Sequence, residues 1–299
     1  MEMREELKKR TGEVESIVDS YLPAEEGYQK TIFEAMNYSV RAGGKRLRPL
    51  FMQEICRLFT GEVQPAVVPF MAAIEMIHTS SLVHDDLPCM DDDMMRRGKA
   101  STWAEYGEDM GVLAGDALMI YAFEVAAKAF NEVSEADDLK RVGRAIEILA
   151  AKTGIYGMIG GQTVDVELSG GPVPKNKLDF IYRLKTGALI EASMLIGAVL
   201  GGAAEEDCKI VESLAGKVGL AFQIQDDILD VTSSQEVLGK PVLSDEKNNK
   251  TTYVTLEGIE KSKHDVKQLS ETAVDILYSL PGKNEFLEEL IEMLVSREK

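Results

Sequence analysis

The sequence predicts an all-α protein, built as one large bundle of about ten helices that covers residues 1–299. Apolar residues recur at helical spacing along almost the whole chain, whereas runs that alternate polar and β-branched residues are missing. The 299 residues are 45% hydrophobic, so the chain can bury a substantial core. The breaks between apolar segments are short, so neither an interdomain linker nor a solenoid repeat is expected.

The first four expected helices end at breaks that contain glycine or proline. Gly43-Gly44 separates the second helix from the third, and Thr60-Gly61 follows the third, because glycine and polar residues cluster where chains turn. The fourth ends near Pro88, which restricts the residue before it and removes a backbone donor. The expected ranges are 3–21, 25–42, 47–60 and 65–87.

The remaining helices are separated by the polar or glycine-rich breaks 88–98, 169–172 and 232–250. The most apolar run, residues 187–204, contains Glu191 and is rich in glycine and alanine. It is therefore expected to be a packed core helix, and no membrane span is expected. The expected ranges are 109–131, 137–156, 176–202, 206–230, 252–280 and 284–297.

The chain is strongly acidic, with a formal net charge of -18 at pH 7. Its field would repel nucleic acid and anionic lipid, so no nucleic-acid partner is expected and an anionic ligand would need local cations or a metal. Cys56, Cys89 and Cys208 show no CxxC spacing, which argues against disulfides or structural zinc and favours a cytoplasmic location. No signal peptide is expected, because the N-terminal residues are charged and lack an apolar core.

Residues 81–98 carry the first of two aspartate clusters, with five aspartates in nine positions. Asp85 and Asp91 are six residues apart, so a continuous helix would point them about 240° from each other. Because Pro88 should end the helix, the following loop can turn Asp91 back toward Asp85. The carboxylates would then gather at a helix C-terminus, where negative charge opposes the helix dipole.

The second cluster lies in residues 225–230, again at the end of an apolar helix. Asp226 and Asp230 are four residues apart, which places both carboxylates on one helix face, with Asp227 beside them. Both clusters offer hard oxygen ligands without a His or Cys partner, and this suits magnesium, which readily shares its shell with phosphates. The two clusters are therefore expected to hold a diphosphate between them through magnesium.

Basic residues that could bind the same anion lie in two short segments. The turn GGKRLRP at residues 43–49 enters a helix and presents free amides and cations to an anion. Arg96 and Arg97 follow the first aspartate cluster, and their forked guanidinium groups can each grip phosphate oxygens with two hydrogen bonds. Further polar residues in apolar surroundings are Gln162, Asp165, Lys185 and Thr186.

Five motifs resemble the short-chain trans-prenyl diphosphate synthases, also called polyprenyl synthetases. In chain order over residues 43–230 they read GGKRLRP, HDDLPCMDDDMMRRG, GQ..D, KT and FQIQDDILD. The DDxxxxD form of the first aspartate motif is similar to that of bacterial farnesyl and of bacterial or plant geranylgeranyl diphosphate synthases. The resemblance implies an isoprenoid synthase fold with a central cavity, and a homodimer formed through apolar helices such as 109–131.

The resemblance also implies a magnesium-dependent transfer of an allylic group, such as dimethylallyl, geranyl or farnesyl, to isopentenyl diphosphate. The allylic carbon–oxygen bond would ionise, the double bond of isopentenyl diphosphate would capture the cation, and the released diphosphate could remove a proton. Three magnesium ions per site would be held by Asp85, Asp86, Asp91, Asp226, Asp227 and Asp230.

Other residues implied by the resemblance bind the two diphosphates or face the cation. The allylic diphosphate would be held by Arg96, Lys185 and Lys240. Isopentenyl diphosphate would be held without metal by Lys45, Arg48, His78 and Arg97. Gln162 would also bind substrate, and Thr186 and Gln223 would face the allylic cation with their oxygens. Residues 232–250 would form a lid that excludes water, with Lys250 binding diphosphate on closure.

Residue 80, five positions before the first aspartate, is implied by the resemblance to set the product length. Farnesyl-type bacterial enzymes carry an aromatic cap there, whereas this chain has Ser80 followed by Ser81. A small floor leaves room for a further isoprene unit and favours geranylgeranyl over farnesyl diphosphate. Alternatively, the cavity is closed by Ile74, Ile77, Met119 or Phe123.

Two other classes remain open from the sequence. His84-Asp85 is typical of HD-type metal phosphohydrolases, but those enzymes need more histidine ligands than a chain with only three histidines readily offers. A terpene cyclase or a non-catalytic subunit of the same fold is the other alternative, although both aspartate motifs and the GGKRLRP turn are present. Diphosphate release that requires both substrates would exclude the hydrolase and the cyclase.

Overall fold

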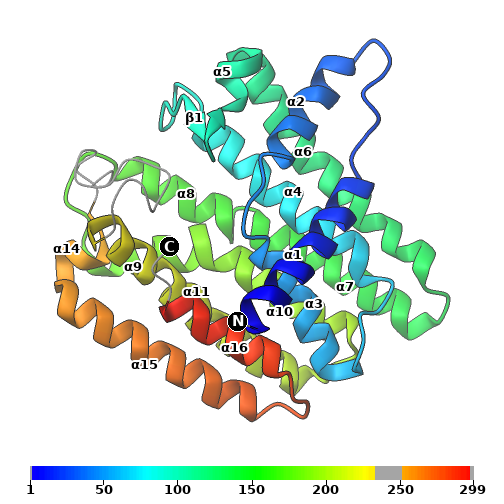
Figure 1. The fold of residues 1–299 in the computed structure, drawn as a ribbon, viewed down its shortest axis with the longest axis vertical. Helices are drawn as coiled ribbons and strands as arrows, with labels where there is room; N and C mark the ends of the chain where they lie inside the picture. The colour runs from blue at the N-terminus through cyan, green and yellow to red at the C-terminus, as the bar shows by residue number, and fades with distance from the viewer. Residues whose placement is uncertain (1, 233–250, 297–299) are drawn as a thin grey trace. The chain divides into compact units, whose positions relative to one another are not determined.

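The computed structural model describes residues 2–232 and 251–296, and these residues are almost entirely helical, as predicted (Figure 1). Contacts divide the chain into two compact units. Unit 1 comprises Met1–Gln53 and Val63–Ile146, and unit 2 comprises Glu54–Glu62 and Glu147–Lys299. The all-α class is confirmed, while a single domain over residues 1–299 stays a prediction.

Unit 1 is built around α4 (Val67–Asp85), which packs against α1 (Glu2–Ser20), α2 (Lys30–Val40) and α6 (Glu108–Ala127). Most of α4 is apolar and buried on every side, as expected for the central helix of a core. The other elements that belong wholly or partly to unit 1 are α3 (Leu47–Thr60), β1 (Met95–Arg96), β2 (Lys99–Ala100), α5 (Thr102–Tyr106), the 3-10 helix η1 (Lys128–Glu132) and α7 (Ala136–Thr153).

Glycines on α6 allow α4 to approach closely. A Cβ added to Gly115 would lie 2.1 Å from Nε2 of His84, and one added to Gly111 would lie 3.0 Å from Cδ2 of Leu87, just after α4. The Ser80 hydroxyl donates a hydrogen bond of 2.9 Å to the carbonyl oxygen of Gly115 and is fully buried. The C-terminal half of α4, which leads into the first aspartate cluster, is therefore fixed against α6.

Unit 2 is built around the long helix α11 (Glu205–Thr232), which packs against several helices of this unit. These partners are the π-helix η2 (Tyr182–Gly187), α10 (Ala188–Leu200), α14 (Tyr253–Glu257), α15 (Ile259–Tyr278) and α16 (Glu285–Ser296). The remaining helices of this unit are α8 (Met158–Glu167) and α9 (Lys175–Ile181). Every residue of α10 is buried, and its Glu191 pairs with Lys152 at 2.6 Å, as suits the predicted core helix.

Two predicted helices are interrupted in unit 2, and one helix was not predicted. The expected helix 176–202 is divided by the π-helix, and the expected helix 252–280 breaks at Gly258, whose φ of 80° ends α14. The missed helix α8 carries a Gly160-Gly161 pair in its first turn, which weakens helix propensity. A Cβ at Gly161 would lie 2.2 Å from the backbone nitrogen of Lys185, so this glycine permits contact with η2.

Unit 1 also departs from the prediction. The expected helix 25–42 begins only at Lys30, after turns that include Gly27 at a φ of 85°. The two-stranded hairpin β1–β2 was not predicted. Its turn is Arg97-Gly98, where φ angles of 53° and 78° suit the left-handed turn of a two-residue hairpin. Arg-Gly is a weak hairpin signal compared with Asn-Gly, so the sequence did not reveal it.

Two helices in the described part of the chain are long and apolar enough to cross a membrane by composition. In the first, Val67–Asp85, 72% of the most apolar 18-residue segment is buried in the protein. In the second, Glu108–Glu132, 39% of this segment is buried. Because core helices pass the same test, the expected absence of a membrane span stays a prediction.

Candidate functional site

The first aspartate cluster follows α4 directly. The helix ends at Asp85, and the chain then folds back, because the Asp91 amide donates to the Asp85 carbonyl oxygen at 2.9 Å. The Asp93 amide donates in the same way to the carbonyl oxygen of Asp86 at 3.1 Å. The loop after Pro88 therefore turns back as predicted, with Asp91 exposed and Asp86 only 2% exposed.

Arg96 on β1 holds the buried carboxylate of this cluster. Its Nε donates to both oxygens of Asp86, at 3.0 and 3.1 Å, and its Nη2 also donates to this carboxylate. Burial raises the pKa of Asp86, and the hydrogen bond and charge of Arg96 counteract this only in part. The guanidinium expected to grip the allylic diphosphate is thus already placed beside the aspartates.

The turn GGKRLRP folds around two arginines. Arg46 has a φ of 51°, lies only 5% exposed, and pairs with buried Glu75 of α4 at 2.7 Å. Arg97 donates to the carbonyl oxygen of Gly43, and a Cβ at Gly44 would lie 2.8 Å from the Arg97 Nη2. The second glycine of the motif therefore lets the Arg97 guanidinium approach the turn.

Four residues expected to bind isopentenyl diphosphate belong to unit 1: Lys45, Arg48, His78 and Arg97. Burial lowers the pKa of His78 most, and the positive charges of Arg48 and Arg97 lower it further. His78 is therefore neutral at pH 7 and lies within a strongly positive field. Lys45 is exposed at the tip of the turn. This arrangement suits an anion that is bound by arginines without metal.

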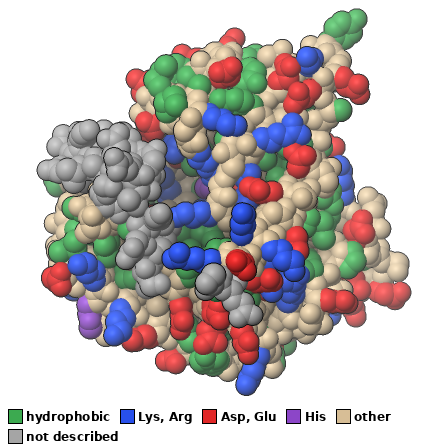
Figure 2. All heavy atoms as spheres, viewed as in Figure 1, with side chains coloured by type: hydrophobic (Ala, Val, Ile, Leu, Met, Phe, Trp, Pro, Cys, Tyr) green, Lys and Arg blue, Asp and Glu red, His purple; other side chains and the backbone are tan. Residues whose placement is uncertain are grey.

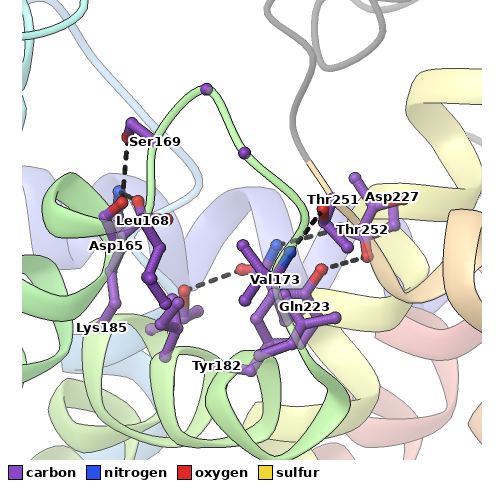
Figure 3. A pocket seen from close by; sticks show the side chains of 15 residues that line it. Asp165, Leu168, Ser169, Val173, Tyr182, Lys185, Gln223, Asp227, Thr251 and Thr252 are labelled. Atoms are coloured by element: carbon purple, nitrogen blue, oxygen red, sulfur yellow. Dashed lines mark hydrogen bonds and ion pairs between the residues drawn. The ribbon is translucent and has the colours of Figure 1, made fainter.

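In unit 2, the second aspartate cluster lies near the C-terminal end of α11. Asp227 and Asp230 are buried, at 4% and 5% exposure, and Asp226 is partly buried. The Asp227 carboxylate accepts hydrogen bonds from the Tyr182 hydroxyl and the Gln223 side-chain amide (Figure 3). It also accepts one from the Tyr253 amide. This network was not expected from the sequence.

The π-helix carries the two residues of the KT motif to different partners. Lys185 Nζ lies 2.6 Å from Oδ2 of Asp165 on α8, and the Thr186 hydroxyl donates to Oε1 of Gln223 at 2.8 Å. Both pairs line a pocket of unit 2 (Figure 3). The sequence motifs GQ..D, KT and FQIQDDILD are therefore brought together in part by the structure, although Gln162 does not line this pocket.

Each aspartate cluster alone supplies only part of the ligands that a magnesium ion needs. Among residues 2–232 and 251–296, no three His, Cys, Asp or Glu side chains converge on one point that could hold an ion. Each cluster still offers carboxylate oxygens without nitrogen or sulfur ligands. Such a partial shell matches an ion that takes its remaining ligands from water and phosphate.

Some expected site residues stay predictions. Lys240, Lys250 and the expected lid up to Lys250 lie outside the described residues, apart from Thr232 at the end of α11. The two aspartate clusters belong to different units, so their meeting around one diphosphate also stays a prediction. On the face drawn in Figure 2, basic side chains are interspersed with acidic ones, so the net charge of -18 does not form a uniform acidic surface there.

Comparison with known proteins identifies the family. The chain matches the family model described as polyprenyl synthetase over residues 29–288. It belongs to the polyprenyl synthetase family. The chain is 44% identical to a heterodimeric geranylgeranyl pyrophosphate synthase large subunit 1 of Arabidopsis thaliana, over 88% of this chain and 71% of that protein. It is 39% identical to a farnesyl diphosphate synthase of Geobacillus stearothermophilus, over 98% of this chain and 97% of that protein.

A solved polyprenyl synthetase supports the fold. The structure is similar to that of a geranyltransferase from Helicobacter pylori complexed with magnesium and isoprenyl diphosphate, with a TM-score of 0.83 and 32% identity. The match covers 97% of this chain and 95% of the other. This polyprenyl synthetase is therefore a prenyltransferase with the all-α isoprenoid synthase fold, and the HD-type phosphohydrolase alternative is wrong.

Sequence reasoning missed three polar residues that contact the motifs of this polyprenyl synthetase: Glu75 in unit 1, and Tyr182 and Tyr253 in unit 2. Glu75 stands inside an apolar run, a position where a carboxylate needs a cationic partner. Tyr182 lies three and four residues before Lys185 and Thr186, so helical spacing could have pointed to it. No local signal in the sequence marks the bond from the Tyr253 amide to Asp227, which joins residues 26 apart.

Proposed function

We propose that this prenyltransferase condenses isopentenyl diphosphate with allylic diphosphates and releases geranylgeranyl diphosphate. The observation that carries the substrate class is a grouping of cations in unit 1, where the Arg97 guanidinium contacts the GGKRLRP turn that carries Arg48. This group offers an anion site that needs no metal, while the nearby aspartates offer a second site that does. These two sites match two diphosphate substrates, of which isopentenyl diphosphate would bind without metal and the allylic diphosphate through magnesium.

The residues of the chain would act on the departing diphosphate and on the cation. Magnesium, held by Asp85, Asp86 and Asp91 and by the aspartates of α11, would neutralise charge on the allylic diphosphate when bound. Arg96, already aligned beside Asp86, would donate hydrogen bonds to the same diphosphate.

Thr186 and Gln223 would stabilise the cation with their oxygens. Their side chains are hydrogen-bonded to each other at 2.8 Å, which fixes the direction of both groups before substrate arrives. Such preorganised dipoles require little rearrangement when charge develops.

A test needs only purified chain, magnesium and two substrates. Diphosphate should be released when isopentenyl diphosphate and an allylic diphosphate are both present, because condensation consumes both. Release from the allylic diphosphate alone would instead indicate a cyclase or a hydrolase. No release under any combination would indicate a non-catalytic subunit.

The twenty-carbon product is favoured because residue 80 is small. Ser80 lies on α4 less than two turns before Asp85, fully buried against α6. A serine there occupies far less space than an aromatic ring would. Relatives are named for both product lengths, so the size of this residue decides between them in this proposal.

We expect Ser80→Tyr to shorten the product to fifteen carbons or fewer, because a phenol ring projects where the chain would extend. Ser80→Ala, which stays small, should retain the parental length. Mass analysis of the product made from each allylic starter measures this. A folded Ser80→Tyr variant with the parental product distribution would show that Ile74, Ile77, Met119 or Phe123 sets the length instead.

A homodimer formed through α6 belongs to the same proposal. Leu113 and Ile120 on α6 are 50% and 72% exposed, and they line an apolar groove together with Tyr28 and Ile32. Exposed apolar surfaces of this kind are commonly covered by a partner, here a second copy of the chain. Sedimentation of a monomer at micromolar concentration would contradict the dimer. A cytoplasmic location likewise stays part of the proposal.

A further inference from the structure

The Asp227 carboxylate is enclosed by donors from three helices. Its Oδ2 accepts from the Tyr182 hydroxyl of η2 and, at 2.8 Å, from the Tyr253 amide of α14. Its Oδ1 accepts at 3.2 Å from Nε2 of Gln223, one turn earlier on α11. The side chain is only 4% exposed, so both oxygens serve the protein and little of either faces solvent.

Turning Asp227 toward a metal ion would be costly. Tyr182 and Tyr253 are each 7% exposed, so water cannot readily replace the carboxylate as acceptor of the Tyr182 hydroxyl, and the Tyr253 amide would keep only its bond of 3.2 Å to that hydroxyl. A buried donor without an acceptor destabilises a protein more than an intact hydrogen bond stabilises it. Asp226, by contrast, is only partly buried, and successive helix residues point about 100° apart.

Tyr253 is itself held firmly. Its hydroxyl donates to Oδ2 of Asp265 at 2.8 Å, and the ammonium groups of Lys175 and Lys261 lie 4.6 and 5.7 Å from its ring centroid. The preceding residue, Thr252, caps α14 through a reciprocal pair of hydrogen bonds with Thr255. The Tyr253 amide, which donates to Asp227 from α14, is therefore held in place by other contacts within unit 2.

The same network reaches the KT motif. Gln223 accepts from Thr186 and donates to Asp227, and Tyr182 begins the π-helix that carries Thr186. A change at Asp227 would thus be transmitted to the side chains that line the pocket (Figure 3).

We propose that Asp227 is a positioning residue that Tyr182 and Tyr253 hold away from metal, and that it fixes α11 against η2 and α14. Metal binding in this cluster is then left to its neighbours, with Asp226 the partly exposed member. The inference rests on the proposed function, which supplies the magnesium and the diphosphate. It replaces the metal-binding role that the family resemblance and the proposed function give to Asp227, and it leaves the other metal ligands of that proposal unchanged.

Hydrogen exchange tests the hydrogen bonds without substrate or metal. In Asp227→Ala the Tyr253 amide should exchange about tenfold faster or more, because it loses its shorter hydrogen bond, of 2.8 Å, and keeps only the bond of 3.2 Å to the Tyr182 hydroxyl. Tyr182→Phe should also accelerate this exchange, since the amide loses its second acceptor, the Tyr182 hydroxyl, and Asp227 loses a donor that orients it. Tyr278→Phe is the matched control, because it removes an exposed hydroxyl that donates to Glu288, and it should leave this amide unchanged.

Metal binding separates positioning from coordination. Manganese affinity in the presence of inorganic pyrophosphate, measured by electron paramagnetic resonance, should fall about tenfold or more in Asp226→Ala and change only about twofold in Asp227→Ala. An equal loss in both variants would overturn the proposal, and so would unchanged Tyr253 exchange in Tyr182→Phe. Should Asp227→Ala not fold, exchange in Tyr182→Phe decides alone.

These readouts are distinct from the test of the function. The exchange measurement needs no catalysis, so it can support the network even when no prenyl product forms. Conversely, if the enzyme is active but exchange of the Tyr253 amide is unchanged in Tyr182→Phe, the proposed function stands and this inference is wrong.

Discussion

Asp85→Ala and Asp226→Ala should each lower turnover by about 10²- to 10⁴-fold, the largest effects expected from single substitutions in this chain. Each removes a carboxylate that would hold magnesium against the allylic diphosphate, and each tenfold loss corresponds to about 1.4 kcal/mol of transition-state stabilisation. Both side chains are only partly buried, so the free energy of unfolding should change by about 1 kcal/mol or less.

Steady-state turnover at saturating magnesium, with circular dichroism to check folding, measures these effects. Asp137→Ala is the control, because its side chain is 80% exposed and its ion pair with nearby Lys140 lies at the surface. It should retain parental turnover. If Asp85→Ala or Asp226→Ala also retained it, the aspartate clusters would have no role in ionisation.

Arg46→Ala and Glu75→Ala should each lower the free energy of unfolding by about 3–5 kcal/mol. The two side chains are 4% and 2% exposed and pair at 2.7 Å, so either substitution leaves a buried charge without its nearest counterion; Arg46 would keep only the longer pair of 3.8 Å with half-exposed Glu15. Arg46 also donates to the carbonyl oxygen of Val40 at 2.7 Å. Loss of this arginine would therefore loosen the GGKRLRP turn and weaken diphosphate binding as well.

Urea denaturation measures the loss, and Arg41→Ala is the matched control. Arg41 pairs with Asp19 at 2.6 Å, but the side chains are 51% and 55% exposed, so its removal should cost about 1 kcal/mol or less. Equal losses in Arg41→Ala and Arg46→Ala would show that the buried pair does not anchor the turn.

The helical class was predictable because the apolar spacing persists through both units. The places where these helices are interrupted were not predictable. Nothing in the residue types of 176–202 distinguishes a π-helix from an α-helix, since the difference lies in which carbonyl each amide reaches. The α8 helix was missed because Gly161 lowers local propensity, whereas packing against Lys185 requires a glycine there.

The site was predictable where function depends on residue type and spacing. Pro88 predicts that the chain folds back after α4 and brings Asp91 near Asp85. The structure shows this fold, with a hydrogen bond from the Asp91 amide to the Asp85 carbonyl oxygen. The roles of individual residues within a motif depend on backbone angles and distant partners. Arg46 turns inward because of its φ of 51°, and Asp227 is enclosed because Tyr253 arrives from another helix. Neither relation is visible in the local sequence.

The π-helix makes Tyr182–Gly187 sensitive to chain length in a way that most of this protein is not. Deleting one residue there would restore ordinary α-helical winding and rotate one flank by about 100° relative to the other. Either Tyr182 or Thr186 would then face the wrong neighbour. Substitutions in this segment can therefore accumulate during evolution, whereas insertions and deletions within it should be selected against.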